Sequence, residues 1–190
     1  MVGIINNAIA DLVVQRFGES VWEAVAERAR LECPVYDSTR NYDDAETMRI
    51  VEALSVELAI AAEDVLFVFG KWWIGYSEKT YGALLRMSGD SFLDCLMSLD
   101  ALHGRIKMAF PDSHPPSFRV ARTEDGRILL HYQSVRAGLG SIVRGILVGI
   151  ADNMGITLQI TEHDDPIDGH RVFEIQPSGL GSWDAINPVG

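Results

Sequence analysis

The chain has 190 residues, 47% of them hydrophobic and 23% charged, with a formal net charge of −11. This composition is typical of a globular protein. The acidic charge disfavours binding to nucleic acids, because an acidic chain repels their phosphates. No apolar run reaches the roughly 18 residues of a membrane span. The two cysteines, Cys33 and Cys95, are too few for a disulfide framework or a four-cysteine zinc site. Because we also find no secretory signal at the start of the sequence, we expect a cytoplasmic protein.

The first half of the chain has the apolar spacing of helices. Helices are predicted, in chain order, over residues 4–17, 20–30, 44–58, 61–73 and 78–87. Gly18 ends the first of these, and Ser20 with Glu23 forms a capping box that opens the second. These elements indicate an N-terminal helical lobe, which we place at residues 1–60.

A further amphipathic helix over residues 92–110, capped by residues 88–91, carries a histidine within its apolar stripe. At about 100° per residue, several apolar side chains lie within roughly 60° of His103, namely Phe92, Leu96, Leu99, Ile106 and Phe110. A lone histidine on such a face is more often a core residue that donates to a carbonyl. It cannot hold zinc alone, but it can be the single protein ligand of a heme iron.

After this helix the pattern changes to that of strands. Pro115 and Pro116 exclude a helix, and Glu124-Asp125-Gly126 is a hairpin signal. Strands are predicted over residues 117–122, 127–136, 156–162 and 170–176, with a crossing helix over residues 139–153. The order predicts an α+β fold: a helical lobe, then a lobe with the long helix, a four-stranded antiparallel sheet and the crossing helix. We assign residues 61–177 to this second lobe and residues 178–190 to an irregular tail.

Three hydrogen-bond donors recur at every second position near the end of the second predicted strand. Alternation places Tyr132, Ser134 and Arg136 on one face. A phenol, a hydroxyl and a guanidinium in a row suit one or two carboxylates or phosphates. A strand end that runs into solvent would show the same pattern, and the spacing alone does not decide between the two interpretations.

The histidine and the three donors together match the needs of an iron porphyrin, an apolar disc with two propionates. The chain resembles the heme-nitric oxide/oxygen-binding (H-NOX) family, which is related to the heme domain of soluble guanylate cyclase. The resemblance covers residues 1–176. It rests on MVGIINNAIADLVVQRFGESVWE, NYDDAET, FGKWW, SLDALHGRI, FPDSHPPSF and LHYQSVRAGL. The last of these contains the Tyr-x-Ser-x-Arg motif, the most specific of the set.

The resemblance assigns roles to individual residues. It implies heme b (iron protoporphyrin IX) with His103 as its proximal iron ligand, propionates bound by the Tyr-x-Ser-x-Arg residues, and an acidic partner for Arg136 at Asp44. Pro116 matches a proline that presses on the heme. The remaining pocket residues that it implies are Ile5, Ile9, Trp73, Leu102 and Ser141.

The function implied by this resemblance is a sensor of nitric oxide and carbon monoxide. In the family, nitric oxide weakens the iron–histidine bond, and the resulting shift is read by an effector such as a histidine kinase or a cyclic-di-GMP enzyme. Oxygen binders of the family carry a tyrosine at the position of Ser141, so no stable oxygen binding is expected. Two alternatives remain: a heme enzyme of the peroxidase or oxygenase kind, and a module of this fold that binds a non-heme ligand.

Three other features have simpler interpretations. Residues 163–170 are rich in metal-ligand types but match no binding spacing, so we expect a solvated hairpin loop there. His131 points away from the Tyr132 face and has no partner pattern. Gly145 and Gly149 are expected to allow close packing of the crossing helix on the sheet.

Overall fold

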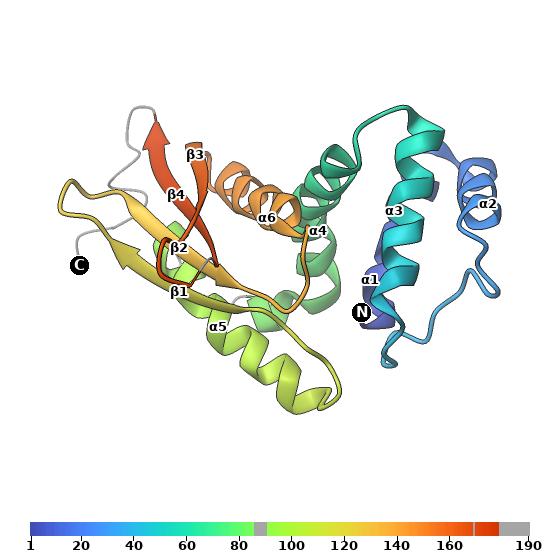
Figure 1. The fold of residues 1–190 in the computed structure, drawn as a ribbon, viewed down its shortest axis with the longest axis horizontal. Coiled ribbons are helices and arrows are strands. Elements are labelled where there is room, and N and C mark those ends of the chain that lie inside the picture. Colours follow the sequence, from blue (N-terminus) through green and yellow to red (C-terminus); the bar gives the residue numbers. More distant parts are fainter. Residues whose placement is uncertain (86–90, 169, 179–190) are drawn as a thin grey trace.

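The computed structural model describes residues 1–85, 91–168 and 170–178. Within these ranges the chain forms six helices and a four-stranded antiparallel sheet (Figure 1), as the α+β prediction required. The helices are α1 (Gly3–Phe17), α2 (Glu19–Arg28), α3 (Asp44–Leu58), α4 (Ala62–Leu85), α5 (Phe92–Ala109) and α6 (Gly140–Asn153). The strands are β1 (Ser117–Arg122), β2 (Ile128–Gln133), β3 (Thr157–Asp164) and β4 (Arg171–Ser178).

The prediction of two separate helices over residues 61–73 and 78–87 is wrong, because α4 runs unbroken from Ala62 to Leu85. A single glycine inside a helix costs only about 1 kcal/mol relative to alanine, so Gly75 weakens α4 without ending it. The rings of Trp72 and Tyr76 stack across this point, with centroids 4.7 Å apart. Residues 86–90, which include the end of the predicted fifth helix and most of the predicted cap of α5, lie outside the described residues.

The N-terminal helices share one apolar core. Side chains of α1, α2, α3 and the first half of α4 form this cluster, and Ala8, Val25 and Ile50 are fully buried in it. Asn6 accepts a 2.7 Å hydrogen bond from Thr47 inside the same core. The predicted lobe boundary at residue 60 falls between α3 and α4, and it stays a prediction because α4 contacts both halves.

The second core joins α5, α6 and one face of the sheet. The strands lie in the order β1-β2-β4-β3, with all neighbours antiparallel. Ile128 and Leu130 of β2 are opposite Ile175 and Phe173 of β4, and all four are fully buried under the two helices. The opposite face, called the outer face below, carries residues of the other parity, among them His131.

Glycines on α6 allow close contact with α4 rather than with the sheet, which corrects the sequence prediction. A Cβ atom added at Gly145 would lie 2.2 Å from the carbonyl oxygen of Phe67, and one at Gly149 would lie 2.8 Å from that of Lys71. Only glycine permits so close a backbone approach. The crossing of α4 and α6 therefore fixes the position of the sheet against the helical lobe (Figure 1).

None of the helices within the described ranges is long and apolar enough to cross a membrane.

Candidate functional site

His103 lies on the C-terminal half of α5, within its apolar stripe. Its Nδ1 atom donates to the carbonyl oxygen of Leu99, 2.8 Å away, in the tautomer that leaves a lone pair on Nε2. Burial lowers the pKa of the imidazole, although the Leu99 carbonyl and the charge of Asp100 act in the opposite direction. The ring is therefore neutral at pH 7, and Nε2 is the nitrogen available to an iron.

The apolar stripe of α5 is covered at one end only. Phe92 and Leu96 are 0% and 1% exposed beneath the sheet. Around His103 the stripe is only half-buried, and the residues that share this intermediate exposure are Leu99, Leu102, Ile106 and Phe110. An apolar surface that the chain itself leaves partly uncovered next to an imidazole is suited to a flat apolar ligand.

Phe118 connects the histidine to the Tyr-x-Ser-x-Arg motif. Its ring centroid lies 5.1 Å from that of His103 and 5.5 Å from that of Tyr132. Phe118 pairs directly with Tyr132 across β1 and β2. Periodicity in the sequence does not distinguish Phe118 from other apolar strand residues, although the hairpin turn at residues 124–126 sets this register. Pro116 precedes β1 and is half-buried.

The three motif residues lie together, but not all on the strand. Strand β2 ends at Gln133, so the predicted strand over residues 127–136 is too long. The backbone N–H of Arg136 donates to Ser134 Oγ at 3.1 Å, a local bond that replaces strand pairing. Tyr132 is only 7% exposed, and burial raises the pKa of its phenol, while a hydrogen bond with Ser134 acts to lower it.

Arg136 connects the sheet to the helical lobe. Its Nε atom lies 2.7 Å from Asp44 Oδ2, which confirms the predicted partner, and Nη1 donates to the carbonyl oxygen of His114. The N-terminal amine of Met1 lies 2.5 Å from Asp44 Oδ1, a contact with no signal in the sequence pattern. Burial favours the neutral acid, but the hydrogen bonds from Met1 and Arg136 outweigh it and lower the pKa of Asp44.

The remaining pocket residues that the resemblance implies, apart from Leu102, come from three helices. Ile5 and Trp73 are half-buried at the edge of the N-terminal core, whereas Ile9 is 3% exposed and lies within it. Ser141, in the first turn of α6, lines a cavity of about 720 Å³ together with residues of the Tyr-x-Ser-x-Arg motif, including Arg136.

The sequence predicted a solvated hairpin loop over residues 163–170. The segment does connect β3 to β4, but β3 continues to Asp164, and the side chains of Asp165 and His170 are only 16% and 10% exposed. Asp165 and His170 approach His131 on the outer face of the sheet. His131 does point away from the Tyr132 face, as alternation required, but it has two titratable neighbours there. These three residues lie in or next to strands, at positions whose side chains point to the same face of the sheet. This alternation could have indicated that they meet, but their spacing along the chain alone does not.

The donor set around α5 and β2 fits a heme. A neutral imidazole, a half-covered apolar stripe and an aromatic ring provide the ligand and the walls, and Tyr132, Ser134 and Arg136 provide donors for carboxylates. The family model described as "Haem-NO-binding" matches residues 2–162. The chain belongs to this family.

Proteins similar to this H-NOX chain include animal cyclases. It is 32% identical over 167 residues to the soluble guanylate cyclase gcy-32 of Caenorhabditis elegans, a match that covers 84% of this chain and 24% of the cyclase. It is 37% identical over 90 residues to the guanylate cyclase soluble subunit beta-2 of Rattus norvegicus, covering 47% of this chain and 13% of that subunit. The H-NOX chain therefore spans about a quarter of the length of the first of these relatives, and less of the second.

Solved H-NOX structures have the same fold. An H-NOX protein from S. oneidensis, solved in the Fe(II)NO ligation state, superposes with a TM-score of 0.83 at 24% identity, covering 94% of this chain and all of that one. An H-NOX domain from Shewanella oneidensis in the Fe(II)CO ligation state gives 0.81 at 25% identity, covering 94% of this chain and 99% of that domain. The chain is thus an H-NOX heme-binding gas-sensor domain of the guanylate cyclase type.

Proposed function

We propose that this H-NOX chain senses nitric oxide and carbon monoxide through a heme b bound by His103. The observation that carries the proposal is the state of this imidazole: it is neutral, its Nδ1 is used by the Leu99 carbonyl, and it lies on a half-covered apolar stripe. A bound ferrous heme supplies the iron at which a diatomic gas binds.

The chain's own residues position the cofactor. The Leu99 carbonyl fixes the orientation of the His103 ring, as the hydrogen-bond acceptors beside metal-binding histidines commonly do. Leu102 and Phe118 line the disc, and Pro116 presses on its face. Tyr132, Ser134 and Arg136 bind the propionates, and Ile5, Ile9, Trp73 and Ser141 line the side on which the gas enters.

The proposed signal is a change in how the two halves of the chain meet. Asp44 belongs to α3, and Arg136 belongs to the half that holds His103. Any relative movement of the two halves therefore changes the geometry of their ion pair. A two-state change at such a contact is a form of output that a protein partner can read. We propose a histidine kinase or a cyclic-di-GMP enzyme as that partner.

One absorption spectrum tests the proposal. The purified protein should be coloured, or become so with added hemin, and the reduced protein should change its spectrum on addition of nitric oxide and of carbon monoxide. A colourless protein that takes up no hemin would contradict the proposal and favour a non-heme ligand. Rapid turnover of peroxide with a donor dye, far above that of free hemin, would instead favour a heme enzyme.

A further inference from the structure

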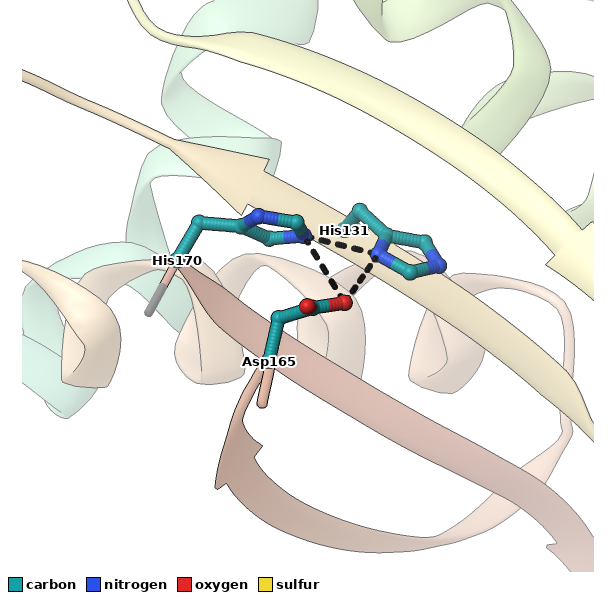
Figure 2. Close-up of side chains that lie close together, drawn as sticks. All are labelled: His131, Asp165 and His170. Carbon is teal, nitrogen blue, oxygen red and sulfur yellow. Dashed lines mark hydrogen bonds and ion pairs between the residues drawn. The ribbon is translucent and has the colours of Figure 1, made fainter. Parts of the chain in front are cut away.

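Three side chains of metal-binding type meet on the outer face of the sheet, and Figure 2 shows them pointing toward one another. His131 lies in β2, Asp165 follows β3, and His170 precedes β4. The Nδ1 atom of His131 and the Nε2 atom of His170 are 2.8 Å apart, and each lies 3.8 Å from Asp165 Oδ2. The three side chains are 10–16% exposed, so this is not a chance meeting of solvated surface groups.

The β-ladder explains why these residues converge. His131 pairs with Val172, so the His131 side chain is on the face opposite Tyr132. The backbone N–H of Asp165 donates to the carbonyl oxygen of His170 at 2.7 Å, which extends the pairing of β3 with β4 by one step. Asp165 and His170 therefore share the outer face, diagonally beside His131.

Two of the three groups are oriented by outer partners, which are hydrogen-bonding groups that contact the cluster without belonging to it. Asp165 Oδ1 accepts the backbone N–H of Ile167 at 2.9 Å, which turns Oδ2 toward the two imidazoles. The Nδ1 atom of His170 donates to the carboxylate of Asp168 and so leaves a lone pair on Nε2. A carboxylate that fixes the tautomer of a histidine in this way is the usual outer partner of a metal ligand.

We propose that His131, Asp165 and His170 form a second metal site, separate from the heme, which binds a divalent transition ion such as Zn²⁺. Two imidazoles and one carboxylate with an open fourth position form a known zinc donor set. Tetrahedral bonds of 2.0–2.1 Å place donor atoms about 3.3 Å apart, so shifts of about half an ångström suffice. A proton on His131 Nδ1 moves to Nε2 of the same ring when the ion binds.

One neighbour opposes the ion. Arg119 Nη2 lies 3.3 Å from His131 Nδ1 and brings a positive charge to the site. Its side chain is exposed and can turn away, and both residues line a cavity of about 450 Å³ through which an ion can enter. Arg119 therefore lowers the affinity, and this gives the proposal a test in which a variant should bind more tightly.

The experiment is a calorimetric titration of the chelator-treated full chain with Zn²⁺. We expect one ion per chain and a higher thermal unfolding midpoint in its presence. His131→Ala and His170→Ala should each lose more affinity than Asp168→Asn, for which we expect the roughly 10–100-fold loss typical of an outer partner. His163→Ala is the matched control, because His163 is exposed on the same face but lies outside the cluster, and it should bind like the wild type.

Arg119→Gln should bind Zn²⁺ more tightly than the wild type, a result that a purely structural His–His–Asp network does not produce. The proposal is overturned by equal zinc binding in the wild type and His131→Ala, or by Mg²⁺ and Ca²⁺ binding as well as Zn²⁺. The readout is zinc and not colour or gas binding, so its outcome is independent of the proposed heme function.

Discussion

The Nε atom of Arg136 lies 2.7 Å from Asp44 Oδ2, although 92 positions separate the two residues in the chain. Asp44 begins α3 in the helical lobe, and Arg136 follows β2 in the half that holds His103. The guanidinium has five N–H donors, and Asp44 and the His114 carbonyl use Nε and Nη1. One side chain can thus hold the two halves together while it offers donors to a propionate.

Asp44→Asn should speed heme loss. The variant keeps the size of the side chain but removes the charge that fixes Arg136 Nε, so the guanidinium spends less time in the orientation that reaches a propionate. We expect an effect smaller than that of deleting the guanidinium itself, measured as transfer of heme to an apomyoglobin acceptor. Glu52→Gln, an exposed change on the same helix, is the control and should leave the rate unchanged.

Acid should abolish the stabilisation that Asp44 provides. Hydrogen bonds from Met1 and Arg136 lower the pKa of this carboxyl in the folded state, so folding favours the carboxylate. This stabilisation is complete above the ordinary pKa of about 3.9 and is lost as the pH falls through the lowered folded value. Urea unfolding at a series of pH values should show a difference between wild type and Asp44→Asn that shrinks toward low pH. A difference that grows on acidification would contradict this.

Local patterns in the sequence predicted the elements well, and contacts between distant residues poorly. The amphipathic stripe of α5, the hairpin at Gly126 and the succession of helices and strands along the chain follow from periodicity and turn chemistry. The end of β2 was missed because the hydroxyl of Ser134 competes with strand pairing. The meeting of His131 with His170 depends on strand register, which forms only when the sheet assembles.

Arg136→Ala should speed heme loss to apomyoglobin more than Ser134→Ala does. The guanidinium supplies charge as well as hydrogen bonds, about 1.5–3 kcal/mol for a charged hydrogen bond, whereas a hydroxyl supplies a neutral one of about 1 kcal/mol. Ser134→Ala also removes the acceptor for the backbone N–H of Arg136, so a small effect is expected there as well. The reverse order of rates would argue against a propionate clamp.

His103→Gly should yield a protein that holds heme only when imidazole is supplied. The substitution removes the ring and leaves a space on the half-covered stripe of α5 that free imidazole can fill. Heme content and absorption spectrum, recorded with and without imidazole, measure the effect. His114→Gly is the matched control, because His114 is exposed and its described contact with Arg136 is through the backbone. Unchanged heme content in His103→Gly without imidazole would show that another residue binds the iron.

The gas that the protein retains depends on the side chains on the gas side of the heme. Oxygen bound to ferrous iron carries partial negative charge, so its retention depends on a hydrogen-bond donor on the gas side of the heme. Of the residues proposed there, Ile5 and Ile9 have no side-chain donor. Ser141 has a short hydroxyl, and the indole ring of Trp73 packs against Phe69 and Tyr76, with centroids 5.9 and 5.7 Å away.

Nitric oxide and carbon monoxide need no such donor, so we expect the reduced, heme-loaded protein to bind both and to retain no oxygen in air. The measurement is an absorption spectrum recorded after the reductant is removed and air is admitted. Ser141→Tyr alone should not create lasting oxygen binding, since the new phenol also needs a partner to hold it, and the apolar side chain of Ile9 offers none. A lasting change of spectrum in air in the wild type would refute the prediction. Ser141→Ala and Trp73→Phe would then identify the donor, because only the variant that removes it should lose that spectrum.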